Sequence, residues 1–306
     1  MKINLPNPQL SPPRLLQRPT IALNVEGTSA RVLLARGDRV LAWGEVPLEP
    51  GLVKEGVIAD SQAVGIALKS LLDSHRALGG RLIASVTGLR SIPRILELPK
   101  MKPQMMEAAV AREAKREMPV PLEDIYLSWQ PLAASNGHQS VFALGVPRDT
   151  LDPLLRAIAV TGKRAYAVDI KPLALARAVD RREAIIADIE PESADIVVVT
   201  GGMPAIMRTV VSRGDGADVE GSIDRCRGEL ARTIKFYNDT HRQEPLAPST
   251  PLFLTGSLAE EAAAAIESLE GLASYPVEAL RPPLECPPDL PVASYAVNIG
   301  LAAKGV

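Results

Sequence analysis

The chain has 306 residues, of which 46% are hydrophobic, 23% charged and 3% aromatic, and its formal net charge is −2. This length favours about two domains and suffices for a large buried core, while the charge balance disfavours generic nucleic-acid binding. No apolar run approaches the roughly 20 residues of a membrane span, and the N-terminus lacks a signal-peptide pattern. Cys226 and Cys286 lie far apart, so we expect neither a disulfide framework nor a zinc site, and a reducing cytoplasm fits.

The 27 prolines concentrate in two stretches of the chain. Five of them lie in residues 1–19, and five more lie in residues 282–291. Because proline fixes φ and lacks an N–H donor, both stretches are predicted to be extended. We interpret the first as an N-terminal arm and the second as a connection to a last helix, over residues 294–304.

The first predicted elements form a three-stranded meander. Short apolar or alternating runs predict strands at residues 20–24, 31–36 and 39–46, joined by turns at 26–29 and 37–38. Asp60 is a predicted N-cap for an amphipathic helix that ends near Gly79-Gly80, and a strand follows at 82–87.

A second unit begins near Leu89. Pro103 opens a helix in which Met106, Val110, Ala114 and Met118 recur every four residues. The pattern then predicts strands at 125–130 and 140–147, a helix at 149–161, a strand at 164–169 and a helix at 172–179.

The meander pattern then returns. Strands are predicted at 184–188, 196–200 and 205–211, followed by a helix at 222–240, a strand at 252–255 and a helix at 258–269. In each half, a strand that ends in an acidic or amide residue precedes a small-residue turn, two more strands and then helices. This duplication is more informative than any single motif.

Searches for metal-binding and nucleophile motifs fail. His75, His138 and His241 are isolated, without a second ligand at helical spacing, and no G-x-S-x-G sequence occurs. The Thr161-Gly162-Lys163 sequence is similar to the end of a P-loop, but Ala157 stands where the first glycine belongs. We therefore predict no catalytic residues and no metal site.

The order of elements resembles the actin-like ATPases, in particular the FtsA-like proteins and, more closely, the PilM family of type IV pilus assembly proteins. The stretches that carry this resemblance are 47–53 (PLEPGLV), 55–60 (EGVIAD), 95–99 (ILELP), 117–125 (EMPVPLEDI), 229–237 (ELARTIKFY) and 293–302 (ASYAVNIGLA). The resemblance implies an α/β, actin-like (ribonuclease H-like) fold with duplicated lobes, an inserted α+β subdomain and a reduced insertion in the second lobe.

The implied domain organisation has four parts. Residues 1–19 form the proline-rich arm, residues 20–88 and 168–183 the first lobe, residues 89–167 an inserted partner-binding subdomain, and residues 184–306 the second lobe.

In the family, a turn in each lobe clasps ATP phosphates. The resemblance assigns the following residues to this pocket: Asn24, Glu26, Gly27, Thr28, Ser29, Asp188, Glu190 and Gly256. The first turn departs from the family's Asp-x-Gly, because Asn24 supplies an amide and Glu26 replaces the glycine nearest the phosphates. In the second turn Asp188 is kept, but Glu190 replaces the glycine and Pro191 removes a backbone donor.

These departures predict a degenerate or absent nucleotide site. Two carboxylates at about 5 Å from a polyphosphate would cost several kcal/mol at an effective dielectric constant near 20. The same prediction holds if Glu26 and Glu190 simply point into solvent. The alternatives are an active ATPase, in which Asp188 handles Mg²⁺ and Gly27, Thr28 and Ser29 contact phosphate, and a sugar-kinase relative. We expect no cofactor; binding of ATP with Mg²⁺ is the less favoured outcome.

The arm residues Ile3, Asn4, Leu5 and Pro6 resemble the Ile-Asn-Leu-Leu-Pro segment of PilN, the membrane partner of PilM. In the family this extended segment lies in a groove between the first lobe and the inserted subdomain, a mode typical of peptide docking beside a strand. This suggests the hypothesis that the arm docks in its own groove or in that of a second copy; the alternative is a proline-rich disordered tail. The predicted groove residues come from the inserted subdomain and include Met101, Met105 and Met106.

The resemblance thus implies a cytoplasmic scaffold of type IV pilus assembly that acts by binding a partner, without ATP turnover. Its implied partner is the N-terminal tail of a PilN-like inner-membrane protein with one membrane span. The chain would then lie at the inner membrane through this partner, without a span of its own and without nucleic acid.

Overall fold

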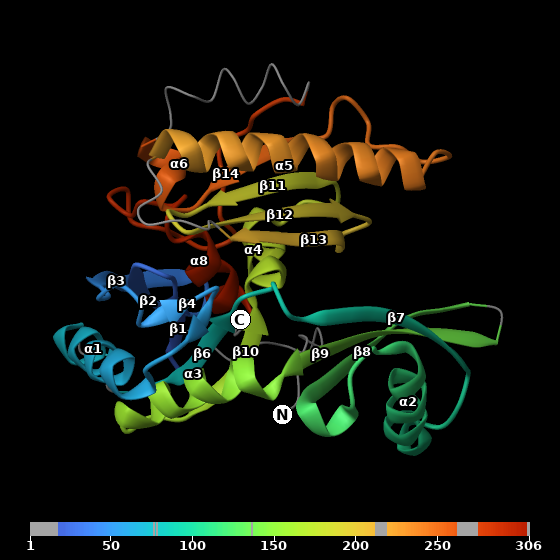
Figure 1. Ribbon diagram of the computed structural model, residues 1–306, viewed down its shortest axis with the longest axis horizontal. Helices are drawn as coiled ribbons and strands as arrows, with labels where there is room; N and C mark the ends of the chain where they lie inside the picture. The colour runs from blue at the N-terminus through green and yellow to red at the C-terminus, as the bar shows by residue number, and fades with distance from the viewer. Residues whose placement is uncertain are drawn as a thin grey trace.

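The computed structural model describes residues 18–75, 77, 79–135, 137–211, 219–261 and 275–304. These residues form two lobes and an insertion, arranged around helices that lie between the lobes (Figure 1). The predicted N-terminal arm, including Ile3, Asn4, Leu5 and Pro6, lies outside the described residues apart from its last two positions.

The first lobe contains a five-stranded sheet of order β10-β6-β1-β2-β3. Its strands are β1 (Thr20–Val25), β2 (Ser29–Arg36), β3 (Arg39–Pro47), β6 (Arg81–Val86) and β10 (Ala165–Ile170). β1 pairs antiparallel with β2 and parallel with β6, which confirms the predicted meander and extends it with crossover strands. A small hairpin of β4 (Val53–Lys54) and β5 (Val57–Ile58) precedes α1 (Ser61–Ser74).

Helices cover both faces of this sheet because its strands are apolar on both sides. Ile21 and Leu23 face α1 and α3 (Arg148–Val160), whereas Ala22 faces the opposite layer. That opposite layer consists of α4 (Lys171–Val179) and α8 (Ala296–Ala303). As predicted, Asp60 is the N-cap of α1, with its carboxylate accepting from the backbone of Gln62 and Ala63.

The second lobe contains a four-stranded sheet of order β13-β12-β11-β14. Its elements are β11 (Ala184–Ile189), β12 (Ser193–Thr200), β13 (Met203–Val211), α5 (Val219–Thr240), β14 (Leu252–Thr255) and α6 (Ser257–Glu261). α5 and α6 pack on one face, and α4 packs on the other, with α8 beside α4. The antiparallel β11-β12-β13 meander confirms the predicted duplication.

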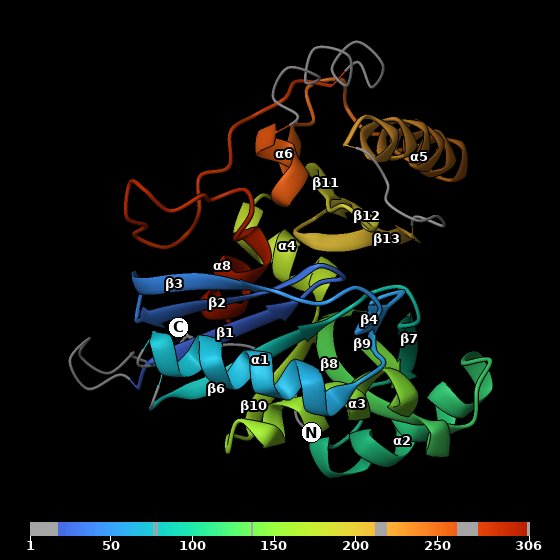
Figure 2. The ribbon, with the colours of Figure 1, turned by 60° about the vertical axis from the view of Figure 1, so that its left-hand side comes forward.

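α4 and α8 are therefore a shared layer between the two lobes, as Figure 2 also shows. Two residues of the 293–302 stretch explain how α8 fits there. The Asn298 side chain is fully buried and donates to the carbonyls of Ala22 and Arg31, at 3.0 Å each. Gly300 lies so close to Ala174 of α4 that a Cβ atom would be 1.8 Å from the Ala174 carbonyl oxygen.

The insertion is a three-stranded antiparallel sheet of order β7-β9-β8 with α2 on one face. Its elements are β7 (Ile92–Pro99), α2 (Pro103–Glu117), the short 3₁₀ helix at Leu122–Asp124, β8 (Ile125–Ser135) and β9 (His138–Pro147). The predicted four-residue spacing is confirmed as a core pattern, because Met106, Val110, Ala114 and Met118 are all buried against the sheet.

The structure differs from the expected organisation near the end of the insertion. α3 packs against α1, and β10 pairs with β6, so both belong to the first lobe although they precede residue 168. β7 was not expected as a strand because prolines at both ends interrupt its pattern. The helix expected at 258–269 is described only to Glu261.

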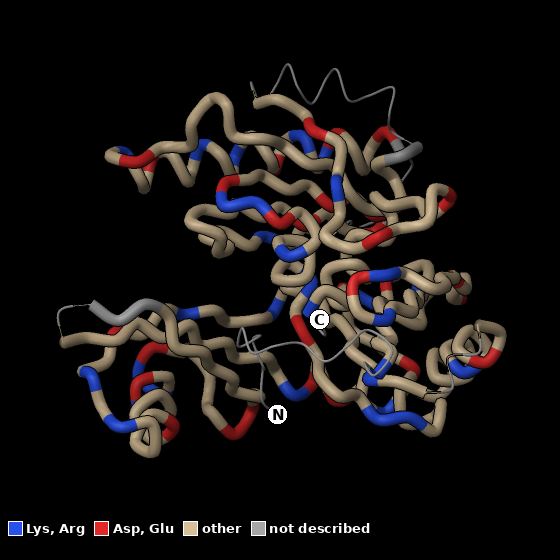
Figure 3. Tube along the Cα trace, turned by 180° about the vertical axis from the view of Figure 1, so that it is seen from behind, with Lys and Arg blue, Asp and Glu red and all other residues tan. Residues whose placement is uncertain are grey.

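Acidic and basic residues are interspersed along the described trace (Figure 3). Within the described ranges, no helix combines the length and apolar character that crossing a bilayer requires. Both cysteines are free.

Candidate functional site

The two turns singled out in the sequence occupy equivalent places in the two lobes. In each, the glutamate N–H donates to the carbonyl of a serine three residues later, Glu26 to Ser29 and Glu190 to Ser193, at 2.8 Å. The turns meet across the cleft between the lobes, where carboxylate oxygens of Glu26, Asp188 and Glu190 all lie within 4.8 Å of one another. The structure therefore brings together the acidic residues that the resemblance assigned to one pocket.

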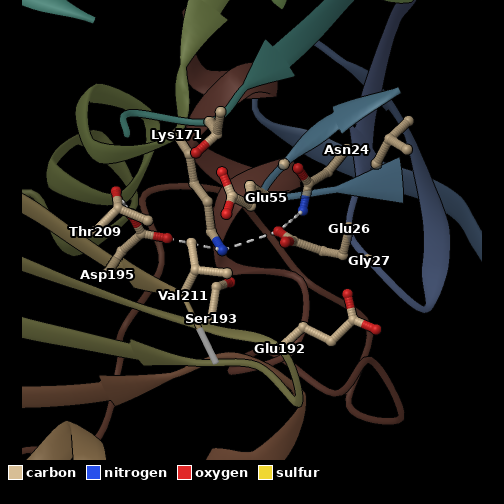
Figure 4. A pocket seen from close by; sticks show the side chains of 13 residues that line it. Asn24, Glu26, Gly27, Glu55, Lys171, Glu192, Ser193, Asp195, Thr209 and Val211 are labelled. Atoms are coloured by element: carbon tan, nitrogen blue, oxygen red, sulfur yellow. Dashed lines mark hydrogen bonds and ion pairs between the residues drawn. The ribbon is translucent and has the colours of Figure 1, made fainter. Parts of the chain in front are cut away.

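A lysine that was not predicted lies among these carboxylates, and Figure 4 shows it between Glu26 and Asp195. Lys171 is the first residue of α4, and its side chain is 4% exposed. Its ammonium lies 2.9 Å from Glu26, 2.8 Å from Asp188 and 3.0 Å from Asp195. Because Glu26 belongs to the first lobe and the two aspartates to the second, this one cation bridges the cleft.

A second ion pair crosses the cleft beside the first. Arg31 on β2 donates to Glu190 at 2.7 and 3.3 Å, to Glu45 at 3.0 Å and to the carbonyl of Ser294 at 3.2 Å. The Glu190 carboxylate also accepts from the Ser257 hydroxyl at 2.6 Å. Every oxygen of Glu190 thus has a donor from the protein itself.

The charge states of this cluster follow from burial and proximity. Burial by itself would lower the pKa of Lys171, but the surrounding carboxylates, led by Asp188, raise it well above its usual value. Burial raises the pKa of Glu190, and repulsion from Glu26 adds to this rise against the attraction of Arg31. Burial also raises the pKa of Asp195 against the attraction of Lys171, and repulsion from Asp188 adds to this rise.

Two other residues assigned to the pocket make contacts within the protein. The Asn24 amide donates to Glu26 at 2.8 Å and accepts from Ser85 at 2.6 Å. Gly256 has φ +92°, and a Cβ there would lie 2.3 Å from the carbonyl oxygen of Ile189, so close packing of β14 against β11 requires glycine. Of the remaining three, Gly27 is half-buried, Thr28 exposed and Ser29 buried.

The alternative interpretation of the two glutamates, that they point into solvent, is wrong. Glu26 and Glu190 do not point into solvent, because they are 8% and 3% exposed and both form cross-lobe ion pairs. A bound Mg²⁺–phosphate group fits this arrangement poorly: Lys171 already contacts three carboxylates, and the buried carboxylates of Glu26 and Glu190 would repel phosphate. The pocket beside this cluster has one basic lining residue, Lys171, against four acidic ones, Glu26, Glu55, Glu192 and Asp195, so its charge disfavours phosphate.

The sequence interpretation missed Arg31, Lys171 and Asp195. A signal was present, since Arg31 and Asp195 are charged residues inside otherwise apolar strands, where a buried charge requires a partner. The identity of each partner depends on how the lobes meet, which no local pattern encodes.

A second candidate site is a groove between the first lobe and the insertion. Its lining is mainly apolar and comes from both units: Val86, Tyr126, Leu127, Ser128, Leu144, Val146, Leu151, Val168, Asp169 and Ile170. Two of its strands, β8 and β10, are the edge strands of their sheets. The groove therefore lies between two sheet edges.

The charged group in this lining, Asp169, is internally paired. It forms ion pairs with Arg177 and with Lys304, the latter at 2.9 Å, and is 2% exposed. Tyr126 is held at the groove by its hydroxyl, which donates to Asp152 at 2.8 Å, and by Arg148 above its ring.

The three methionines named as groove candidates do not line this groove. Met106 is 4% exposed and belongs to the core of the insertion, and Met101 packs partly against that core. Met105 is 58% exposed, but none of the three lines the groove. The residues that do line it lie on strands rather than on α2.

Comparison with known proteins identifies the fold. No protein-family model matches the sequence. A solved structure of the PilM–PilN type IV pilus biogenesis complex superposes with a TM-score of 0.78 at 22% identity, over 96% of this chain and 99% of that chain.

Two further solved structures are similar at lower scores. The ethanolamine utilization protein EutJ from Carboxydothermus hydrogenoformans has a TM-score of 0.55 at 12% identity, over 97% of this chain and 91% of that one. The cytoplasmic domain of EpsL, an inner-membrane component of the type II secretion system of Vibrio cholerae, has a TM-score of 0.50 at 13% identity, over 92% and 94%. The chain thus has the expected actin-like fold, and its predicted resemblance to PilM is confirmed at the level of that fold.

Proposed function

We propose that this chain is a cytoplasmic scaffold of type IV pilus assembly, located at the inner membrane through its partner. It binds the extended N-terminal tail of a PilN-like protein with one membrane span. The observation that carries this proposal is the apolar groove between the first lobe and the insertion, in a chain whose fold resembles PilM over nearly its whole length.

The groove suits an extended peptide for a structural reason. Edge strands present unpaired backbone N–H and C=O groups, which an added strand can satisfy. Tyr126–Ser128 on β8 and Val168–Ile170 on β10 supply such edges on the two sides. The apolar side chains between them, including Leu144 and Val146, can receive alternate aliphatic side chains of the peptide.

The proposed scaffold works without ATP turnover. This part of the proposal is supported by the cleft between the lobes, where Lys171 and Arg31 neutralise the acidic residues that would otherwise face a metal ion. A titration of the purified protein with ATP and Mg²⁺ checks it, and micromolar affinity would contradict it.

The groove assignment is tested by titrating the protein with a peptide that contains Ile-Asn-Leu-Leu-Pro. Ser128→Trp places a bulky side chain in the groove, whereas Ser140→Trp changes a residue on the same face of the insertion sheet but outside the groove lining. We expect Ser128→Trp to weaken binding on the order of tenfold or more and Ser140→Trp to leave it unchanged. Equal affinities for the two variants would refute the assignment.

The arm residues Ile3, Asn4, Leu5 and Pro6 lie outside the described residues, and their docking stays a prediction. If the arm competes for the groove, removal of residues 1–10 should raise the affinity for the peptide. It should also reduce self-association if the arm reaches a second copy. Unchanged affinity and unchanged association after removal would contradict this prediction.

A further inference from the structure

The cleft between the lobes contains its own cation. Lys171 follows β10 of the first lobe directly, yet its ammonium contacts Asp188 and Asp195 of the second lobe as well as Glu26 of the first. All three partners are at least nine-tenths buried. Ordinary surface ion pairs lack such burial and contribute little to stability.

Each of the three carboxylates also accepts a hydrogen bond from a side chain of its own lobe. Asp188 accepts from the Thr255 hydroxyl at 2.7 Å, and Asp195 accepts from the Thr209 hydroxyl. Glu26 accepts from Asn24. Each carboxylate therefore has one partner in its own lobe and shares Lys171 with the other lobe.

We propose that Lys171 is a built-in cation that holds the two lobes together, so that closure of the cleft requires no bound ligand. The reasoning is electrostatic: without the lysine, three carboxylates from opposite lobes would face one another in a buried space. Such an arrangement must open, bind protons or bind a cation from solution. With the Lys171 ammonium in place, the cluster is neutralised without opening of the cleft, protonation or a cation from solution.

The proposal predicts that removal of the lysine creates a demand for an external cation. In Lys171→Met the side chain keeps a similar length but loses its charge. We expect its melting temperature to fall on the order of 10 °C, because one partner of a buried ionic cluster is lost. Millimolar Mn²⁺ should restore part of this loss, since carboxylate oxygens are suitable ligands for it.

Lys69→Met is the matched control, because Lys69 pairs with Asp73 on α1 with both side chains 55% exposed. This control and the unaltered protein should show no Mn²⁺-dependent shift. An unchanged melting temperature in Lys171→Met overturns the proposal, as does an equal Mn²⁺ shift in the unaltered protein.

A second variant keeps the test decisive if Lys171→Met does not fold. Glu26→Gln removes only the first-lobe partner and leaves the lysine paired within the second lobe. We expect faster amide hydrogen exchange at both turns, 26–29 and 190–193, with unchanged exchange at the centres of β1 and β11. Unchanged exchange at the turns overturns the proposal. The peptide groove plays no part in either measurement, so the outcome is independent of the proposed partner.

Discussion

Gly300 of α8 is a sharp test of how the two lobes are joined. Its backbone lies against Ala174 of α4, where a Cβ atom would be 1.8 Å from the carbonyl oxygen and 2.5 Å from the carbonyl carbon. The obstacle is backbone, which cannot rotate away as a side chain can. Gly300→Ala therefore forces α4 and α8 apart by about 1.5 Å, in an interior packed as closely as a crystal.

The magnitude follows from two opposing effects. Overpacking against backbone costs about 3 kcal/mol, while replacing a helical glycine by alanine returns about 1 kcal/mol of helix propensity. We expect a net loss of about 2 kcal/mol in the free energy of unfolding. Because α8 packs on the first-lobe sheet and α4 packs on the second-lobe sheet, a loss at their contact weakens the junction of the two lobes rather than one element.

Gly228 of α5 provides the matched control. A Cβ atom there would meet only the Arg232 guanidinium, at 3.7 Å, so Gly228→Ala should stabilise the protein by about 0.5–1 kcal/mol. Urea unfolding, compared at equal m-values, measures both changes. If Gly300→Ala is as stable as Gly228→Ala, the close packing of α4 on α8 is refuted.

Three further predictions concern single side chains. Burial raises the pKa of Cys226 to about 12, so a thiol reagent should label the partly exposed Cys286 in the native protein and Cys226 only after unfolding; rapid labelling of both would contradict the structure. Asp60→Ala removes the cap of α1 and should lower the free energy of unfolding by about 1 kcal/mol in urea denaturation, whereas an unchanged midpoint would contradict the capping role. Burial tends to raise the pKa of Asp169, but its two cationic partners outweigh burial and hold this pKa below the usual value of 3.8. The ionised carboxylate therefore stabilises the fold above that pH, and this contribution is lost as the pH falls through the lower pKa of the folded state. Asp169→Asn should therefore flatten the melting-temperature profile below about pH 4, and an unchanged acid slope would contradict this.

The parts of the fold that the sequence predicted depend on local patterns. The two meanders follow from short apolar runs between small-residue turns, and the helix of the insertion follows from the spacing of Met106, Val110, Ala114 and Met118. The side on which α3 packs could not be predicted in this way. Its apolar face would suit either neighbour, and only the tertiary structure places it on α1.

The candidate sites, too, could be predicted only where a local sequence pattern marks them. The turn residues Glu26 and Glu190 were found because they depart from a motif, but their burial depends on Lys171 and Arg31, which lie far away in the chain. The resemblance implied a groove between the first lobe and the insertion, and the structure has a groove there, whose role in binding a partner stays a prediction. The residues that line it could not be predicted, because they depend on which strands form sheet edges.

The central claim is that a partner's tail lies in the groove between the first lobe and the insertion. Photo-crosslinking with benzoylphenylalanine at single tyrosine positions tests where the Ile-Asn-Leu-Leu-Pro peptide binds. Tyr126 lines the groove, whereas Tyr166 lies on β10 outside the lining and is 52% exposed. We predict a peptide adduct from position 126 and none from position 166. An adduct from position 166 alone, or from neither position under conditions where the peptide binds, would contradict the account.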